Sequence, residues 1–180
     1  MPQLRNDAAR SPQTMSIEMP DTIQQTWRAE VPFSMRILEA RQESRSAKTL
    51  FFLRPDRDPL VAAAGDAPAL RLDEFAPGRF VMLWLPRIDE KPFTISWLDE
   101  ERFGITVLRR GPFTQALHSL KPGDWVGLRG PYGKGFTLCD NAAVVAGGVG
   151  MATLATLIER LDSPSVFQGA STACELLFLD

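Results

Sequence analysis

Residues 140–158, DNAAVVAGGVGMATLATLI, decide the fold of this chain. The apolar run 142–146 predicts a buried strand, and a helical pattern follows, with apolar side chains on one face from Met151 to Leu161. The turn between them is Gly147-Gly148-Val149-Gly150. Glycines let the chain turn tightly and let a ligand approach backbone N–H groups at the positive end of a helix. The stretch predicts a strand–turn–helix unit that contacts a nucleotide phosphate.

A turn that serves only close packing is the alternative for these glycines. The sequence does not match G-x-G-x-x-G, because residues 152–154 supply no third glycine. An acidic residue about 20 positions further on, where a dinucleotide site holds the ribose, is also missing. The strand before the turn and the helix after it favour nucleotide contact.

The composition indicates one globular core and part of a second domain. The chain has 180 residues, 44% of them hydrophobic, and its net charge of −2 gives no basis for binding nucleic acid or an anionic membrane. Cys139, Cys174 and the single His118 are too few and too widely spaced to form a metal site or a disulfide framework. We expect a reduced, cytoplasmic protein that holds no metal of its own.

The N-terminal residues lack the apolar core of a signal peptide. Residues 1–33 are polar with scattered prolines, so we expect a disordered extension. The segment 142–158 carries no charge over 17 residues, but glycine, alanine and threonine dilute it. It is also shorter than the roughly 20 strongly apolar residues of a membrane span. We therefore expect no membrane span, and a buried strand, turn and helix instead.

Between residues 34 and 139, short apolar segments alternate with turn residues, which is typical of an antiparallel barrel or sandwich. The run 80–85 is continuously apolar and is expected to be buried on both faces. The six expected strands are 35–40, 49–54, 80–85, 93–97, 102–109 and 125–129.

Few helices are expected. A loop over 56–73 has room for a short one, and residues 114–120 have helical spacing, with Thr114 as the N-cap. After the helix that begins near Met151, a second strand is expected at Val166, and residues 174–179 have the apolar content of a further helix. The sequence therefore predicts a β module followed by an α/β unit.

The segment Lys91-Pro92-Phe93-Thr94 places a cation, a ring and a hydroxyl in one predicted strand. Successive side chains of an extended strand point to opposite faces. Such a segment can therefore place a charge at a phosphate, a ring against a planar group and a hydroxyl at its edge. The alternative is an edge strand with Lys91 in solvent and Phe93 in the core.

A second turn, Arg109-Arg110-Gly111-Pro112-Phe113-Thr114, opens the predicted helix 114–120. Two arginines beside a helix start can hold another phosphate. A capped helix with a solvated basic pair explains the pattern equally well. His118 on this helix is expected to be structural, and no nucleophile, base and acid combination is visible.

In their order along the chain, these segments resemble the electron transfer subunits of dihydroorotate dehydrogenase, within the ferredoxin–NADP reductase superfamily. The resemblance implies a β plus α/β architecture over residues 34–180. An antiparallel six-stranded Greek-key FAD-binding barrel would span 34–139, and the start of a Rossmann-like NAD-binding domain would span 140–180. The segments that carry the resemblance are Pro77-Gly78-Arg79-Phe80-Val81-Met82, 89–96, Gly111-Pro112-Phe113-Thr114, Gly123-Asp124, Gly130-Pro131-Tyr132-Gly133-Lys134-Gly135-Phe136 and Gly147-Gly148-Val149-Gly150.

The resemblance also implies the cofactor contacts. Lys91 would pair the FAD pyrophosphate within the Lys91-Pro92-Phe93-Thr94 motif, and Phe93 would lie near the isoalloxazine. Thr94 would hydrogen-bond near N5, which makes it the candidate catalytic residue. The further contacts implied for FAD are Val107, Leu108, Arg109, Gly111, Phe113 and Thr114, and those for the nicotinamide nucleotide are Gly147, Gly148, Val149 and Gly150.

In this family, a catalytic partner subunit oxidises dihydroorotate during pyrimidine biosynthesis, and electrons pass through a [2Fe–2S] cluster to FAD and then as hydride to NAD+. The cluster cysteines are absent from this chain, and Ser171 replaces the arginine usual in the segment Gly169-Ala170-Ser171-Thr172. We expect a truncated second domain. Two alternatives stay open: a reductase subunit of hydrogenase or sulfide dehydrogenase type, and a non-enzymatic remnant that binds flavin or nucleotide.

Overall fold

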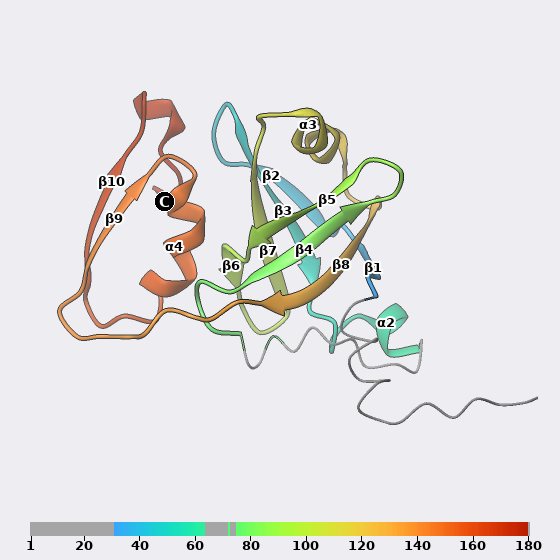
Figure 1. The fold of residues 1–180 in the computed structure, drawn as a ribbon, viewed down its shortest axis with the longest axis horizontal. Helices are drawn as coiled ribbons and strands as arrows, with labels where there is room; N and C mark the ends of the chain where they lie inside the picture. The colour runs from blue at the N-terminus through green and yellow to red at the C-terminus, as the bar shows by residue number, and fades with distance from the viewer. Residues whose placement is uncertain (1–30, 64–71, 73–74, 180) are drawn as a thin grey trace, which may run out of the picture.

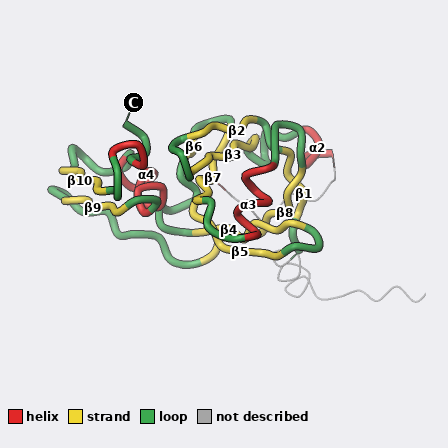
Figure 2. Tube along the Cα trace, turned by 90° about the horizontal axis from the view of Figure 1, so that it is seen from above, coloured by secondary structure: helices red, strands yellow, loops and turns green. Residues whose placement is uncertain are grey.

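The computed structural model describes residues 31–63, 72 and 75–179. Residues 1–30 of the expected extension lie outside this part, and its last residue, Phe33, already begins the first strand. Figure 1 shows a barrel of strands beside a smaller unit, with the helix α4 (Gly150–Ile158) between the barrel and a pair of strands. Figure 2 shows the same arrangement from above. The order along the chain is the expected one, with the β module first.

The barrel consists of two four-stranded antiparallel sheets. The first has the order β1 (Phe33–Arg36), β8 (Trp125–Tyr132), β4 (Phe80–Leu85) and β5 (Asp89–Thr94). The second has the order β2 (Glu39–Gln42), β3 (Ala47–Leu53), β7 (Arg102–Leu108) and β6 (Trp97–Leu98).

Two segments bend from one sheet into the other. Only residues 37–38 separate β1 from β2, and only residues 95–96 separate β5 from β6. With each bent segment counted as one strand, the sheets join at both edges into six strands, and β8 lies between β1 and β4 in Greek-key order. The expected six-stranded antiparallel barrel is confirmed, with the segment 35–40 divided between two sheets.

The main core lies inside the barrel, where aliphatic and aromatic side chains from both sheets meet. Strand β4 contributes Val81, Leu83 and Leu85, whereas Trp84 between them is 38% exposed. The expectation that 80–85 is buried on both faces is therefore wrong. One face of the strand points into the barrel and the other points away from it, as in most antiparallel sheets.

Within the described residues, two short helices accompany the barrel, α2 (Pro59–Ala63) in the expected loop and α3 (Pro112–Ser119). Helix α3 begins two residues earlier than expected, because Pro112 suits the first helical position. Gly111 is its N-cap. Thr114 is not the cap but lies one turn inside, where its hydroxyl accepts hydrogen bonds from the N–H groups of Arg110 (2.9 Å) and Gly111 (3.0 Å).

His118 attaches α3 to the barrel. Its Nε2 lies 2.8 Å from the carbonyl oxygen of Val107 in β7, and Lys48 Nζ donates a hydrogen bond to the carbonyl of His118. Burial lowers the pKa of the His118 imidazole, which favours the neutral form at pH 7. The expected structural role of this histidine agrees with these contacts.

The smaller unit pairs β9 (Ala143–Gly147) in parallel with β10 (Ser165–Gly169), and α4 connects them. The helix expected over 174–179 is wrong. Only a 3-10 turn, Ala173–Glu175, forms there. Beyond it the chain is not helical, and Leu177 is 1% exposed in a small core with Ala47 of the barrel and Met151 of α4. In the segment 174–179, contacts between the two units thus determine the conformation, and the helical preference of the sequence does not. No helix in the part of the chain that the structure describes could span a membrane.

Candidate functional site

A cavity of about 550 Å³ lies where the barrel meets α4. This volume falls within the range of about 300 to 1,000 Å³ that is typical of small-molecule sites. Apolar and aromatic side chains form most of the wall, four threonines supply hydroxyl groups, and one arginine supplies a charge. The lining residues are Phe80, Pro92, Phe93, Thr94, Thr106, Leu108, Arg110, Thr114, Val149, Gly150, Ala152 and Thr153.

The cavity brings together seven of the candidate site residues, although they come from three separate stretches of sequence. The end of β5, the end of β7, the first turn of α3 and the start of α4 meet around it. The seven residues are Pro92, Phe93, Thr94, Leu108, Thr114, Val149 and Gly150. Phe93 and Thr94 both line it, although successive side chains of an extended strand are expected to point to opposite faces.

Lys91 is not among the residues that line this cavity. Its ammonium group lies 2.6 Å from the carboxylate of Asp89, and this contact lowers the pKa of Asp89. Lys91 Nζ also lies 5.9 Å from the ring centroid of Phe113, which stacks on Phe93 with centroids 6.2 Å apart. Lys91 therefore lies beside Asp89 and Phe113 and does not line the cavity.

Strand alternation explains why two further candidates, Val107 and Arg109, do not line the cavity. Val107 is 1% exposed in the barrel core, whereas its neighbour Leu108 points to the cavity. Arg109 likewise lies off the wall, and its backbone N–H donates to the carbonyl of Ser46 (2.8 Å). Gly111 is the N-cap of α3, so it contributes backbone near the cavity rather than lining it.

The glycine turn follows the strand β9. Gly147 lies opposite Gly169 in the parallel pair, and Gly148 has φ of +50°, which glycine adopts without strain. The Gly148 N–H donates to the carbonyl of Gly169 (2.7 Å). Gly148 and Val149 also line a second cavity of about 240 Å³ beside the ends of β9 and β10. Nucleotides commonly bind at this end of parallel strands.

The second cavity combines the hydroxyl groups of three serines with a carboxylate. Its wall combines the hairpin between β2 and β3 with the segment after β10. The lining residues are Ser44, Ser46, Ala47, Leu108, Gly148, Val149, Ala170, Ser171, Glu175 and Leu177.

Of the five other lining residues, Arg110 belongs to the arginine pair already considered for a phosphate, whereas Phe80, Thr106, Ala152 and Thr153 were not predicted. Two of them follow from simple periodicity. Thr106 stands two residues before Leu108 on the same strand face, and Thr153 stands one helical turn after Gly150. Phe80 carried no local signal, because only strand pairing places it opposite Thr94.

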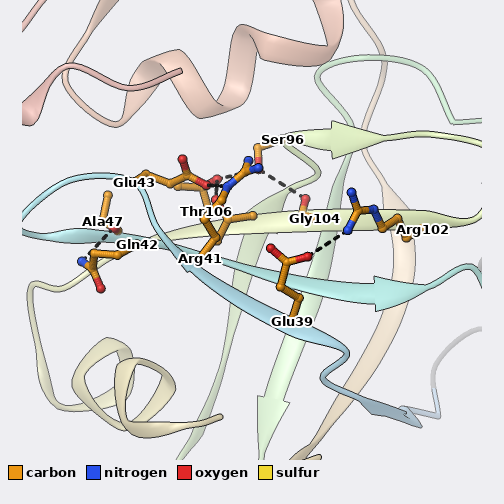
Figure 3. Close-up of polar contacts among 10 residues, drawn as sticks. Glu39, Arg41, Gln42, Glu43, Ala47, Ser96, Arg102, Gly104 and Thr106 are labelled. Atoms are coloured by element: carbon orange, nitrogen blue, oxygen red, sulfur yellow. Dashed lines mark hydrogen bonds and ion pairs between the residues drawn. The ribbon is translucent and has the colours of Figure 1, made fainter. Parts of the chain in front are cut away.

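Thr106, which lines the cavity, belongs to a group of hydrogen-bonded, buried hydroxyls (Figure 3). Its Oγ1 lies 2.6 Å from Ser96 Oγ and 2.8 Å from Thr49 Oγ1, and Ser96 donates to the carbonyl of Gly104 (3.3 Å). All three hydroxyl-bearing residues are at most 6% exposed. These bonds connect β3, β7 and the bend before β6, and they fix the position of Thr106.

Metal-binding groups are not gathered at either cavity. Among residues 31–63, 72 and 75–179, no three His, Cys, Asp or Glu side chains lie close enough together to hold a metal ion. Cys139 and Cys174 are exposed free thiols.

Comparison with known proteins identifies the relatives of this chain. No protein-family model matches it. It is 40% identical over 156 residues to a probable dihydroorotate dehydrogenase B (NAD(+)) electron transfer subunit from Methanocaldococcus jannaschii, which covers 84% of this chain and 52% of the relative. The protein of the same name from Methanothermobacter thermautotrophicus is 40% identical over 157 residues, or 83% of this chain and 53% of the relative. The chain thus spans about half the length of these curated relatives.

The fold is that of FAD/NAD-binding reductases. The chain is similar to the flavohaem-like FAD/NAD-binding domain of nitric oxide dioxygenase from Vibrio cholerae, with a TM-score of 0.67 at 19% identity. That match covers 83% of this chain and 67% of the domain. Over the length that they share, the chain is similar to electron transfer subunits of dihydroorotate dehydrogenase B, and its fold is similar to that of FAD/NAD-binding reductase domains.

Proposed function

We propose that this chain binds FAD in the 550 Å³ cavity and transfers electrons between the flavin, a nicotinamide nucleotide and a dehydrogenase partner. The observation that carries the proposal is the composition of the cavity wall. The motif residues Pro92, Phe93 and Thr94 meet Thr114 of α3 and Gly150 of α4 around one space. The resemblance implies cofactor contacts for all five.

The residues present fit a flavin. Phe80 and Phe93 offer ring surface for a planar ligand, and the rings of Tyr132 and Phe113 support them from behind. The threonine hydroxyls can donate to or accept from the polar edge of such a ligand. Arg110 is the cation on the wall and suits a phosphate.

Bound FAD supplies the redox chemistry itself, by accepting and releasing a hydride. The protein's residues orient the flavin and exclude water from it. Thr94 presents its hydroxyl to the reacting edge, Phe93 supports the ring system, and α4 closes the cavity opposite the barrel. The smaller cavity beside Gly148 and Val149 is the proposed place of the nicotinamide nucleotide.

The partner in this proposal is a catalytic subunit that oxidises dihydroorotate, and the complex is a cytoplasmic hetero-oligomer. Support comes from the names of relatives that are 40% identical to this chain. Co-expression with such a catalytic subunit tests the assignment. A complex that reduces NAD+ with dihydroorotate supports it, and two proteins that do not co-purify contradict it.

The cofactor assignment is tested by titrating the full chain with FAD and following the quenching of flavin fluorescence. We expect saturable binding, since stacking on aromatic rings quenches flavin emission. Ala152→Leu narrows the cavity and should weaken binding, whereas Ala155→Leu on the same helix lies off the cavity wall and should not. A folded chain that binds no FAD would overturn the proposal.

A non-enzymatic interaction module is the second candidate, and one feature favours it. Phe167 and Val145 are neighbours across β9 and β10, and they are 60% and 75% exposed. An uncovered apolar sheet face favours association. If this is its role, the chain should self-associate in sedimentation experiments, Phe167→Glu should abolish association, and anaerobic NADH should reduce no bound flavin. Reduction of bound flavin by NADH would instead support the first candidate, the electron transfer function.

A further inference from the structure

Thr94 has a partner that the flavin motif does not contain. Its Oγ1 lies 3.2 Å from the Oγ1 of Thr153, and both side chains line the 550 Å³ cavity. Thr94 ends β5 of the barrel, and Thr153 lies in the first turn of α4. The two residues are 59 positions apart in sequence. Both are half-buried.

We propose that Thr153 is a positioning residue that sets the direction of the Thr94 hydroxyl hydrogen and allows that direction to reverse. The proposal rests on the proposed function, in which Thr94 faces the reacting edge of FAD. Thr153 acts through Thr94 and need not touch the cofactor.

Each threonine hydroxyl has one hydrogen to donate and two lone pairs that accept. When Thr153 donates to Thr94, the hydrogen of Thr94 is free to point into the cavity. When Thr94 donates to Thr153 instead, a lone pair of Thr94 is free to accept from the cavity. The 3.2 Å contact serves both arrangements, because either oxygen can be the donor.

A flavin needs both arrangements. Its N5 is a hydrogen-bond acceptor in the oxidised form and carries an N–H donor in the reduced form. Thr94 must therefore donate to N5 in one redox state and accept from it in the other. In each case Thr153 forms the hydrogen bond that Thr94 has left to make, as an acceptor for its hydrogen or as a donor to its oxygen.

Loss of the Thr153 hydroxyl affects the two redox states unequally. With oxidised flavin, Thr94 still donates to N5, and it lacks only one accepted bond. With reduced flavin, Thr94 accepts from N5–H and its own hydrogen has no partner. Where bound flavin covers the hydroxyl, a donor without a partner costs more than an unused lone pair. Removal of Thr153 Oγ1 should therefore disfavour the reduced form.

The test is the midpoint potential of FAD bound to the full chain, measured by equilibration with a reference dye. Thr153→Val removes the hydroxyl and keeps the shape. We expect reduced FAD to bind roughly tenfold more weakly relative to oxidised FAD. For a two-electron couple this is a fall in potential of about 30 mV. Thr153→Ser keeps the hydroxyl and should restore the wild-type potential.

Thr156→Val is the matched control. Thr156 lies one turn further along α4, is 3% exposed and donates to the Ile95 carbonyl (3.5 Å), but it does not line the cavity. If Thr153 only attaches α4 to the barrel, both valine variants should shift the potential alike, and the proposal is wrong. If Thr153→Val binds FAD with an unchanged potential, the positioning role of Thr153 is wrong, but the proposed function is not affected. A folded wild-type chain that binds no FAD overturns the proposed function as well.

Discussion

Two cations compete for the phosphate of the proposed cofactor, and their surroundings differ. The resemblance assigns this role to Lys91, but its charge is already matched by Asp89 at 2.6 Å. Arg110 stands on the cavity wall at the start of α3. A guanidinium group also presents several donors in a fixed plane and binds phosphate oxygens in pairs, whereas an ammonium group acts as a point charge.

We therefore predict that Arg110→Gln weakens FAD binding more than Lys91→Gln does. Loss of a hydrogen bond to a charged group costs about 1.5 to 3 kcal/mol, which corresponds to a rise in the FAD dissociation constant of roughly tenfold or more. Arg109→Gln is the control, because the neighbouring arginine lies off the wall. Titration of flavin fluorescence gives the three constants. A larger loss in Lys91→Gln would favour the assignment from the resemblance.

Motif reasoning located site residues where the signal was local. Pro92, Phe93 and Thr94 are adjacent in sequence, and all three line the same cavity. Whether Val107 or Leu108 faces the cavity depends on which face of β7 each side chain occupies. The sequence of β7 is apolar at both positions. Such a strand does not reveal which face points to the barrel core, and only packing decides it.

Among the strands, β7 depends on a residue without a side chain. A Cβ added to Gly104 would lie 3.0 Å from Thr49 and Trp97 side-chain atoms and 3.1 Å from the Phe51 ring. Phe51 is fully buried, and the guanidinium groups of Arg41 and Arg102 lie 4.9 and 5.0 Å from its ring centroid. Gly104 thus makes room for an aromatic and cationic cluster on the outer face of this sheet.

We predict that Gly104→Val destabilises the barrel by about 1 to 3 kcal/mol, the usual cost of adding volume to a packed site. Urea unfolding followed by tryptophan fluorescence measures the change. Gly169→Val is the matched control, because no atom lies within 4 Å of a Cβ added to this strand glycine. Equal destabilisation by both variants would show that loss of glycine, rather than crowding around Phe51, is responsible.

The strands and helices were predicted best where periodicity and length agreed. The run 80–85 coincides with β4. Strand spacing indicated an antiparallel barrel or sandwich, and the six-stranded barrel was what the resemblance implied. The bend at residues 37–38 was not predictable, because it depends on closure of the barrel rather than on a turn signal. The segment 174–179 was wrongly expected to be helical, since its apolar residues serve contacts with distant parts of the chain, as Leu177 does with Ala47.

Across the whole chain, the two units are joined by contacts that no local pattern reveals. The carboxylate of Glu175 accepts hydrogen bonds from the hydroxyls of Ser44 (2.9 Å) and Ser46 (2.5 Å), about 130 residues earlier in the chain. Ser44 Oγ in turn accepts from the N–H groups of Ser46 (3.3 Å) and Ala47 (3.1 Å). Glu175 therefore orders the hairpin between β2 and β3 and attaches it to the smaller unit.

The two serine hydroxyls lower the pKa of Glu175, because they stabilise its charged form. A carboxyl group with a lowered folded-state pKa contributes its full stabilisation above its ordinary value of 4.5. That contribution is lost as the pH falls through the lower pKa of the folded state. The attachment of the hairpin to the smaller unit should thus be constant near neutral pH and weaken in acid.

We predict that Glu175→Ala speeds amide exchange at Ser46 and Ala47 at pH 7, because Ser44 Oγ loses the partner that holds it in place. Hydrogen–deuterium exchange, corrected for intrinsic rates, measures this in the full chain. In the wild type the same amides should become less protected below pH 4.5, whereas Glu175→Ala should show no such pH dependence. Glu100→Ala, at an exposed turn of the barrel, should behave as the wild type. Unchanged protection in Glu175→Ala would mean that the apolar contacts of Ala47 and Leu177 alone join the two units.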